Sequence, residues 1–280
     1  MSRIKRGWAL TKKSWAVLRG HPVLLRFPLY GGVLTLLMTV IVVGPGLYLI
    51  EDGKPAPGAP LVVVGFLLLA IIGTYFSVGL AAAADRIFAG EEASVGDGLA
   101  VSRANLGPIV GWALLSATVG LLFSLLENQG VIGQIIGRLL NVAWSLITFL
   151  AVPVIAIEGT GAITTLKRAG SLFRERWGQQ ITGNIAIGGL IGLFGILPAV
   201  LLIVAGVAVW ASSGFVGALL VIVGVILFAV AALISSALNG IFGVALYRYA
   251  GEGATVGPFT SAELESAVKI KGGGPAPSTI

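Results

Sequence analysis

The residues of this sequence that are best suited to binding a ligand are basic and aromatic side chains in two amphipathic stretches. In residues 3–19 and in residues 158–183, apolar positions recur at spacings of three and four, which places them on one stripe of an α-helix. Such a helix typically lies in a membrane surface, with its cations near lipid phosphates. The predicted headgroup-binding residues are Lys5, Arg6, Trp8, Lys12, Lys13, Trp15, Arg19, Lys167, Arg168, Arg174 and Arg176.

Neutral polar residues inside apolar runs form a second group of candidates. Asn141 and Asn239 are the deepest of them, and Ser235 and Ser236 precede Asn239 by about one helical turn. These residues either line a polar transport path or form hydrogen bonds between packed helices, and we favour the packing role. The centres of the predicted spans carry no ionisable residue, which argues against a proton-coupled pump.

Catalytic and metal-binding chemistry has few residues to work with. The sequence contains no cysteine and a single histidine, His21, which precedes a proline beside a basic stretch. It contains no phosphate-binding glycine loop, no nucleophile elbow and no cysteine–histidine metal spacing. Glu91 and Glu92 are adjacent on a polar turn, where carboxylates are usually solvated. We therefore expect a protein that is not an enzyme and that binds no metal ion and no cofactor.

The elements that must position these residues are long apolar runs. The chain is 56% hydrophobic and 11% charged, and several runs exceed the length of about 18 residues that spans a bilayer. The sequence therefore predicts an all-α, polytopic membrane protein with cytoplasmic amphipathic interfacial helices. Six transmembrane helices are predicted, at residues 29–50, 61–84, 109–126, 139–157, 184–209 and 215–246.

These spans are expected to form a single membrane domain over residues 1–271. Residues 1–28 are its basic amphipathic N-terminal segment, and residues 272–280 are predicted to be a disordered tail. A further surface helix is expected in residues 89–107, opened by a capping box of Ser94 and Asp97 and stopped at Gly107–Pro108.

Two more local patterns bear on the ends of the spans. Thr260 and Glu263 form a second predicted capping box. Glu158 ends the fourth span, where it either pairs with Lys167 or Arg168 or remains a solvated carboxylate. Residues 84–96 and 245–257 share seven of thirteen positions, which leaves open an internal duplication or convergence on one capping solution.

The basic residues also predict the orientation of the chain. Sixteen of the 18 Lys and Arg residues fall on the side that carries both termini, and only Lys54 and Arg138 fall on the other. By the positive-inside rule, both termini are cytoplasmic in a multi-pass protein of the plasma membrane. This bias explains the net charge of +6 without nucleic acid as a partner.

Several separated motifs carry a resemblance to a known family: residues 8–15 (WALTKKSW), 27–28 (FP), 158–159 (EG), 166–169 (LKRA), 176–178 (RWG) and 247–249 (YRY). Together they resemble an uncharacterised family of six-span prokaryotic integral membrane proteins, over almost the whole chain. The EG motif and the basic helix after it are also loosely similar to the membrane domain associated with glycerophosphodiester phosphodiesterases. The soluble phosphodiesterase domain is missing here, so the resemblance implies an architecture and no activity.

From these observations we predict a non-enzymatic integral membrane protein. Its basic amphipathic helices would organise lipid, with anionic membrane lipids as partners, or dock another membrane protein. The alternative is a transporter or lipid-handling permease with a path between kinked spans. A cavity lined by Asn141 and Asn239 would favour that alternative, whereas a solid helical core with a flat basic underside would favour lipid organisation.

Overall fold

The computed structural model describes residues 3–127, 130–177, 196–210 and 212–267. Within these ranges the regular elements are helices and no strand occurs, so the predicted all-α class is confirmed. Residues 184–195 of the predicted fifth span and the predicted disordered tail, 272–280, lie outside the described residues.

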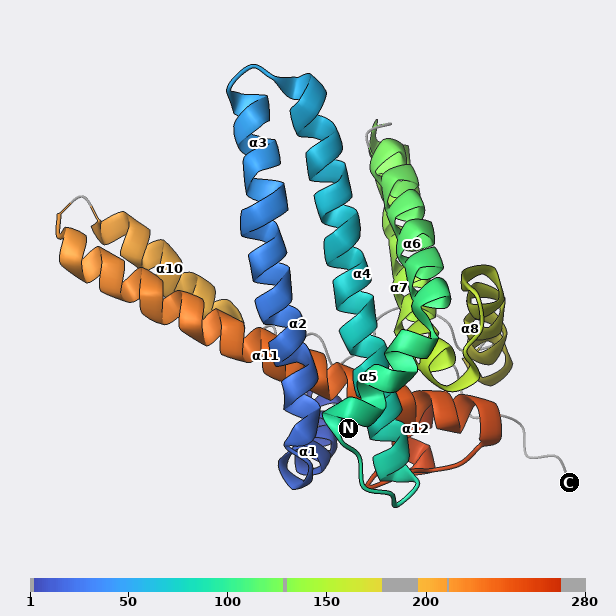
Figure 1. The fold of residues 1–280 in the computed structure, drawn as a ribbon. Coiled ribbons are helices and arrows are strands. Elements are labelled where there is room, and N and C mark those ends of the chain that lie inside the picture. Colours follow the sequence, from blue (N-terminus) through green and yellow to red (C-terminus); the bar gives the residue numbers. More distant parts are fainter. Residues whose placement is uncertain (1–2, 128–129, 178–195, 211, 268–280) are drawn as a thin grey trace, which may run out of the picture.

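The N-terminal helices differ from the prediction in where the first span begins. Helix α1 (Arg3–Gly20) is followed by a nearly continuous helical rod of α2 (Val23–Met38), the π-helical turn η1 (Thr39–Val43) and α3 (Gly44–Glu51). The rod is apolar enough to span a membrane from residue 23, six residues before the predicted start. Helix α4 (Pro55–Phe88) returns beside it as a hairpin (Figure 1).

The central helices confirm one predicted boundary and correct another. Helix α5 (Val95–Ala104) begins with the predicted capping box, because Ser94 Oγ accepts from the Asp97 N–H and the Asp97 carboxylate accepts from the Ser94 N–H. Gly107 and Pro108 do not stop α5. They lie in the first turn of α6 (Leu106–Glu127), where proline fits because its missing N–H would have no helical partner.

Helix α7 (Gly130–Glu158) packs beside α6 and is followed by α8 (Ala162–Trp177). The axes of the two segments Trp144–Glu158 and Ala162–Glu175 differ by 116°. Gly159 lies in this corner with φ +63°, a left-handed conformation that favours glycine. The sharp corner places α8 against α6, α7 and α11, on which it packs.

The last helices are α10 (Leu197–Val209), α11 (Gly214–Glu252) and α12 (Ser261–Ala267). Among the described residues, four helices are long and apolar enough to cross a membrane, or up to five if the bent pair of α7 and α8 counts as one span. These helices define a multi-pass membrane protein, while the predicted number of six is not reached within them. The described part of the fifth predicted span, α10, has 13 residues and is too short by itself.

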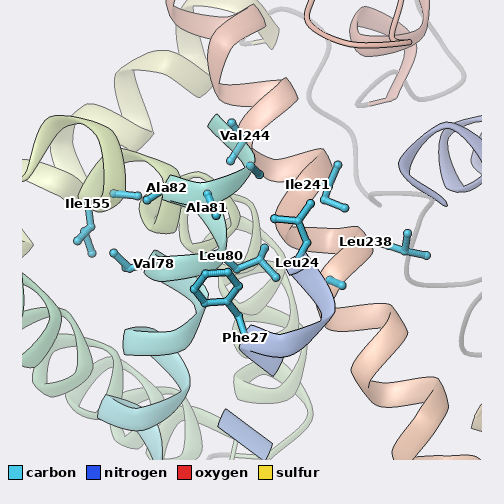
Figure 2. Close-up of a cluster of buried hydrophobic side chains, with 14 of the residues drawn as sticks. Leu24, Phe27, Val78, Leu80, Ala81, Ala82, Ile155, Leu238, Ile241 and Val244 are labelled. Carbon is cyan, nitrogen blue, oxygen red and sulfur yellow. The ribbon is translucent and has the colours of Figure 1, made fainter. Parts of the chain in front are cut away.

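The buried core lies at one end of the molecule. There α1, α5, α8 and α12, which we call the collar, pack around the final turns of α4, α7 and α11; Figure 1 shows α1, α5 and α12 gathered at this end. Figure 2 shows Phe27 of α2 beside Leu80 of α4, with Ile241 of α11 close by. The other halves of the spans, which we call the arms, expose large apolar side chains, as lipid-facing helices do.

Candidate lipid-binding face and membrane groove

Helix α1 has two different faces. Leu10, Ser14, Val17 and Leu18 are buried where α1 packs on α11 and α12. Trp8, Lys12, Trp15 and Arg19 follow one another at spacings of four, three and four on an exposed face, which we call the outer face of α1. The two tryptophan side chains are 49% and 40% exposed, and the Lys12 ammonium lies 5.6 Å from the centroid of the Trp8 ring.

Lys13 lies between these faces and is bound to the protein. Its ammonium donates to Glu263 Oε2 at 2.5 Å, and the same oxygen accepts from the Thr260 N–H at 2.9 Å, which is the carboxylate half of the predicted capping box. Burial disfavours the ionised Glu263, but the hydrogen bonds from Lys13 and Thr260 outweigh it and hold its pKa below the ordinary 4.5. Lys13 therefore fastens α1 to α12.

Helix α8 also presents a buried face that differs from the stripe seen in the sequence. Thr165, Ala169, Leu172 and Phe173 are buried. By contrast, Ile163 is 56% exposed, although it is one of the apolar positions that recur at spacings of three and four in residues 158–183. The buried face of α8 is therefore rotated about the helix axis by part of a turn from the stripe expected from the sequence. Small side chains such as Ala169 pack on the protein without adding to the apolar signal.

Of the alternatives left open for Glu158, the structure shows an ion pair with Arg168. Arg168 Nε donates to Glu158 Oε1 at 2.8 Å, and the Tyr247 hydroxyl donates to the same oxygen at 2.7 Å. Glu158 thus joins the end of α7 to α8 and α11. The alternative of a solvated carboxylate is wrong, because its side chain is 23% exposed and doubly bonded.

A second ion pair was not anticipated from the sequence. Arg248 donates from Nε to Asp85 Oδ1 and from a terminal nitrogen to Asp85 Oδ2, both at 2.7 Å, and also pairs with Glu252 at 2.7 Å. The two-pronged contact fixes the end of α4 against the end of α11 across 163 residues of sequence. In the sequence, this pair is indicated only by one acidic and one basic residue, each at the end of a long apolar run.

The structure thus divides the predicted headgroup-binding residues into three sets. Lys13 and Arg168 are held in ion pairs within the collar. The side chains of Lys5, Arg6 and Arg176 lie outside the described part. The remaining candidates are exposed, and the structure shows no ion pair for the cations among them within the described residues: Trp8, Lys12, Trp15, Arg19, Lys167 and Arg174.

A membrane groove of about 450 Å³ opens between α2, α4, α7 and α11. Its polar lining consists of Thr35, Ser77, Thr148, Ser236 and Asn239, and five glycines leave room beside them. Ser236 and Asn239, two of the candidate residues for a polar path, therefore line this groove. Asn141 and Ser235 do not line the groove. Asn141 is exposed, whereas the hydroxyl of Ser235 is buried without a hydrogen-bond partner among the described residues.

The fold and these surfaces define the class of the protein, a multi-pass α-helical membrane protein with an ion-paired collar at one end. Residues 59–257 match a family described as "Family of unknown function (DUF6159)", and the chain belongs to this family. The matched segment contains the Asp85–Arg248 pair and the Glu158 cluster, while α1 lies before it. No curated protein and no solved structure matches the chain.

Proposed function

We propose that the protein is a non-enzymatic organiser of anionic lipid at the cytoplasmic surface of the plasma membrane. The observation that carries the proposal is the outer face of α1, where Trp8 and Trp15 alternate with Lys12 and Arg19. Tryptophan side chains favour the headgroup layer, and each cation near an anionic surface contributes about 1 kcal/mol. The face thus combines the two interactions that bind a helix to an anionic leaflet.

The inner face of α1 supports the proposal because it holds the outer face in place. Leu10 and Leu18 are buried, and Lys13 is paired with Glu263. A helix ordered in this way loses little further conformational freedom when lipid binds. On α8, Lys167 and Arg174 are exposed in the same manner and would extend the basic surface.

The positive-inside bias supports a cytoplasmic collar. Lys12, Arg19, Lys167 and Arg174 belong to the side with sixteen basic residues, and both termini would lie there if the chain spans the membrane six times. A docked membrane protein is the other partner that these basic surfaces could take. Such a partner would compete with anionic lipid for the same cations.

The experiment uses the full chain purified in mild detergent with mixed phospholipids. We expect K12Q/R19Q to retain less phosphatidylglycerol relative to phosphatidylcholine than the wild type, and high salt to reduce the difference. K54Q/R138Q removes the same charge from the predicted opposite side and serves as the matched control. Equal lipid ratios in both double variants would overturn the proposal.

A transporter or lipid-handling permease is the second candidate, and the membrane groove is the observation that favours it. Pro153, Ser236 and Asn239 line the groove, as a path beside a kinked span would require. Asn141 and Ser235, two further candidates for the path, are absent from the lining, so the groove supports this candidate only in part. Solute or lipid flux in reconstituted vesicles that N239L abolishes, with folding intact, would establish this candidate in place of the first.

A further inference from the structure

The membrane groove contains hydrogen-bonding groups that the described protein does not satisfy. Thr148 Oγ1 donates to the Trp144 carbonyl at 2.8 Å. By contrast, Thr35, Ser77, Ser236 and Asn239 line the groove, and the structure shows no hydrogen-bond partner for their side chains among the described residues. Polar groups at membrane depth are normally bonded to protein, ligand or water, because hydrocarbon offers them nothing.

The position of these groups along the helices places them within the hydrocarbon layer. Ser77 precedes Asp85 by eight residues and Asn239 precedes Arg248 by nine, which corresponds to about 12–14 Å along an α-helix. Half of a bilayer's hydrocarbon core measures about 15 Å. If the ion pairs lie at headgroup level, the polar groups of the groove lie close to the ends of the acyl chains in that leaflet.

The lining also limits the charge of what can bind. It contains no ionisable residue, and its remaining side chains are apolar, glycine or proline. A phosphate would have no cation to pair with at this depth and would be strongly disfavoured. The groove therefore suits an uncharged group that both donates and accepts hydrogen bonds and that carries hydrocarbon.

We propose that the membrane groove binds a diacylglycerol, the neutral glycerolipid that carries two ester carbonyls and one free hydroxyl. The Asn239 amide and the Ser77 hydroxyl donate to the ester carbonyls, and the lipid hydroxyl bonds with Ser236 or Thr35. Phe76, Leu80 and Leu233, which also line the groove, would contact the acyl chain. This site differs in place and in lipid charge from the outer face of α1, so each can fail without the other.

The size of the groove fits this occupant. Its volume of about 450 Å³ lies in the range of about 300–1,000 Å³ that ligand pockets occupy. The glycerol ester region and the start of one chain fit inside it. The rest of the chains would lie on the exposed apolar side chains of the arms, such as Leu36 and Val230.

The test labels the full chain in detergent–lipid micelles with a diacylglycerol that carries a photoreactive diazirine on one acyl chain. We expect cross-linked peptides from the four groove helices α2, α4, α7 and α11, and competition by unlabelled diacylglycerol but not by phosphatidylglycerol. Loss of hydrogen bonds in N239L should reduce labelling about tenfold.

Gly73→Leu gives a second variant, which adds an apolar side chain to the lining of the groove. Gly73 lines the groove, and a Cβ there would meet nothing within 4 Å. Gly120→Leu is the matched control, since Gly120 is equally open in α6 and lies outside the lining. We expect G73L to lose labelling and G120L and K12Q/R19Q to keep it.

Several outcomes would overturn the proposal. Labelling that maps outside α2, α4, α7 and α11, or that G73L and N239L leave unchanged, would show that diacylglycerol binds elsewhere. Competition by phosphatidylglycerol as strong as that by diacylglycerol would show that the groove does not select against charge. An absence of labelling in the folded wild type would indicate that water, another part of the chain or a second copy occupies the groove.

Discussion

The collar and the arms of this protein are held together by different interactions. In the collar, large side chains such as Leu10, Leu172 and Leu264 are buried, and ion pairs join helix ends. In the arms, side chains such as Leu121 face outward, 68% exposed. The difference follows from the solvent, because collar residues leave water when they are buried, whereas arm residues contact lipid whether or not the helices pack.

The arms instead rely on close approach of helix backbones. A Cβ on Gly58 of α4 would lie 2.8 Å from the Gly46 carbonyl oxygen of α3. A Cβ on Gly217 of α11 would lie the same distance from the Gly206 carbonyl oxygen of α10. Small residues at such crossings are the usual means of helix association in lipid, where the hydrophobic effect between helices is absent.

The largest expected effect is the loss of a buried leucine side chain from the collar, compared with the loss of an exposed one from an arm. Leu172→Ala in the collar should lower the free energy of unfolding by about 2–5 kcal/mol, because it empties a site that is 1% exposed. Leu121→Ala in an arm should change it by less than about 0.5 kcal/mol. Reversible unfolding in mixed micelles measures both values, and equal losses would remove the distinction between the regions.

A smaller effect is expected where α4 and α5 cross in the collar. A Cβ on Gly98 would lie 2.4 Å from the Gly79 carbonyl oxygen and 2.5 Å from the Phe27 ring. Gly98→Ala should therefore destabilise the protein by about 1–3 kcal/mol through overpacking. Gly107→Ala should not destabilise the protein, because a Cβ at that position would meet nothing within 4 Å. Thermal unfolding of the two variants measures the difference.

The Asp85–Arg248 pair should be worth about 2 kcal/mol, because it is charged, two-pronged and mostly buried. Arg248→Met leaves the Asp85 carboxylate without its partner, and Asp85→Asn with Arg248→Met completes a double-mutant cycle. Glu252→Gln is the control, since Glu252 pairs with the same arginine but is 54% exposed. A coupling energy near zero would mean that the pair does not hold the two helix ends.

The smallest effect concerns pH. The pKa of Glu263 is lowered in the folded protein, so the stability that its bond with Lys13 contributes is present above about pH 4.5 and is lost as the pH falls through the folded pKa. The contribution of such a partly exposed pair is at most about 1 kcal/mol. Melting temperatures of the wild type and Glu263→Gln should converge at low pH. A difference that grows on acidification would contradict this assignment.

The parts of the fold that the sequence predicted correctly depend on neighbouring residues. The four long apolar helices follow from continuous apolar runs, and the Ser94–Asp97 capping box joins residues close in the chain. The pairing of Glu158 was left open between Lys167, Arg168 and solvent, and the structure selects Arg168. The Asp85–Arg248 pair joins residues 163 positions apart, and local spacing contains no information about it.

The faces of the collar helices were harder to predict for a different reason. Ser14 and Thr165 are buried although they are polar, while Trp8 is exposed although it is aromatic. A helix between a protein core and a lipid surface has two faces that can accept apolar residues. An apolar stripe in the sequence therefore does not show whether that face contacts the protein or the lipid. The membrane groove, likewise, depends on the meeting of four helices.

The similarity of residues 84–96 and 245–257 does not extend to the backbone. The left-handed glycine after α4 is Gly90, which aligns with Gly251. Gly251 is still helical, and α11 ends only at Glu252, followed by Gly253 with φ +70°. The two segments therefore end their helices at different aligned positions, which favours convergence on a capping solution over a preserved duplication.

The central claim is that the collar lies on the cytoplasmic side and the tips of the arms on the opposite side. Because the chain has no cysteine, single cysteines at Pro57 and Ser212 in the arm tips and at Thr164 and Ala262 in the collar can be tested with an impermeant thiol reagent. In intact cells we predict labelling at Pro57 and Ser212, and labelling at Thr164 and Ala262 only after permeabilisation. Labelling of Thr164 in intact cells, or failure of Pro57 to react there, would contradict the claim.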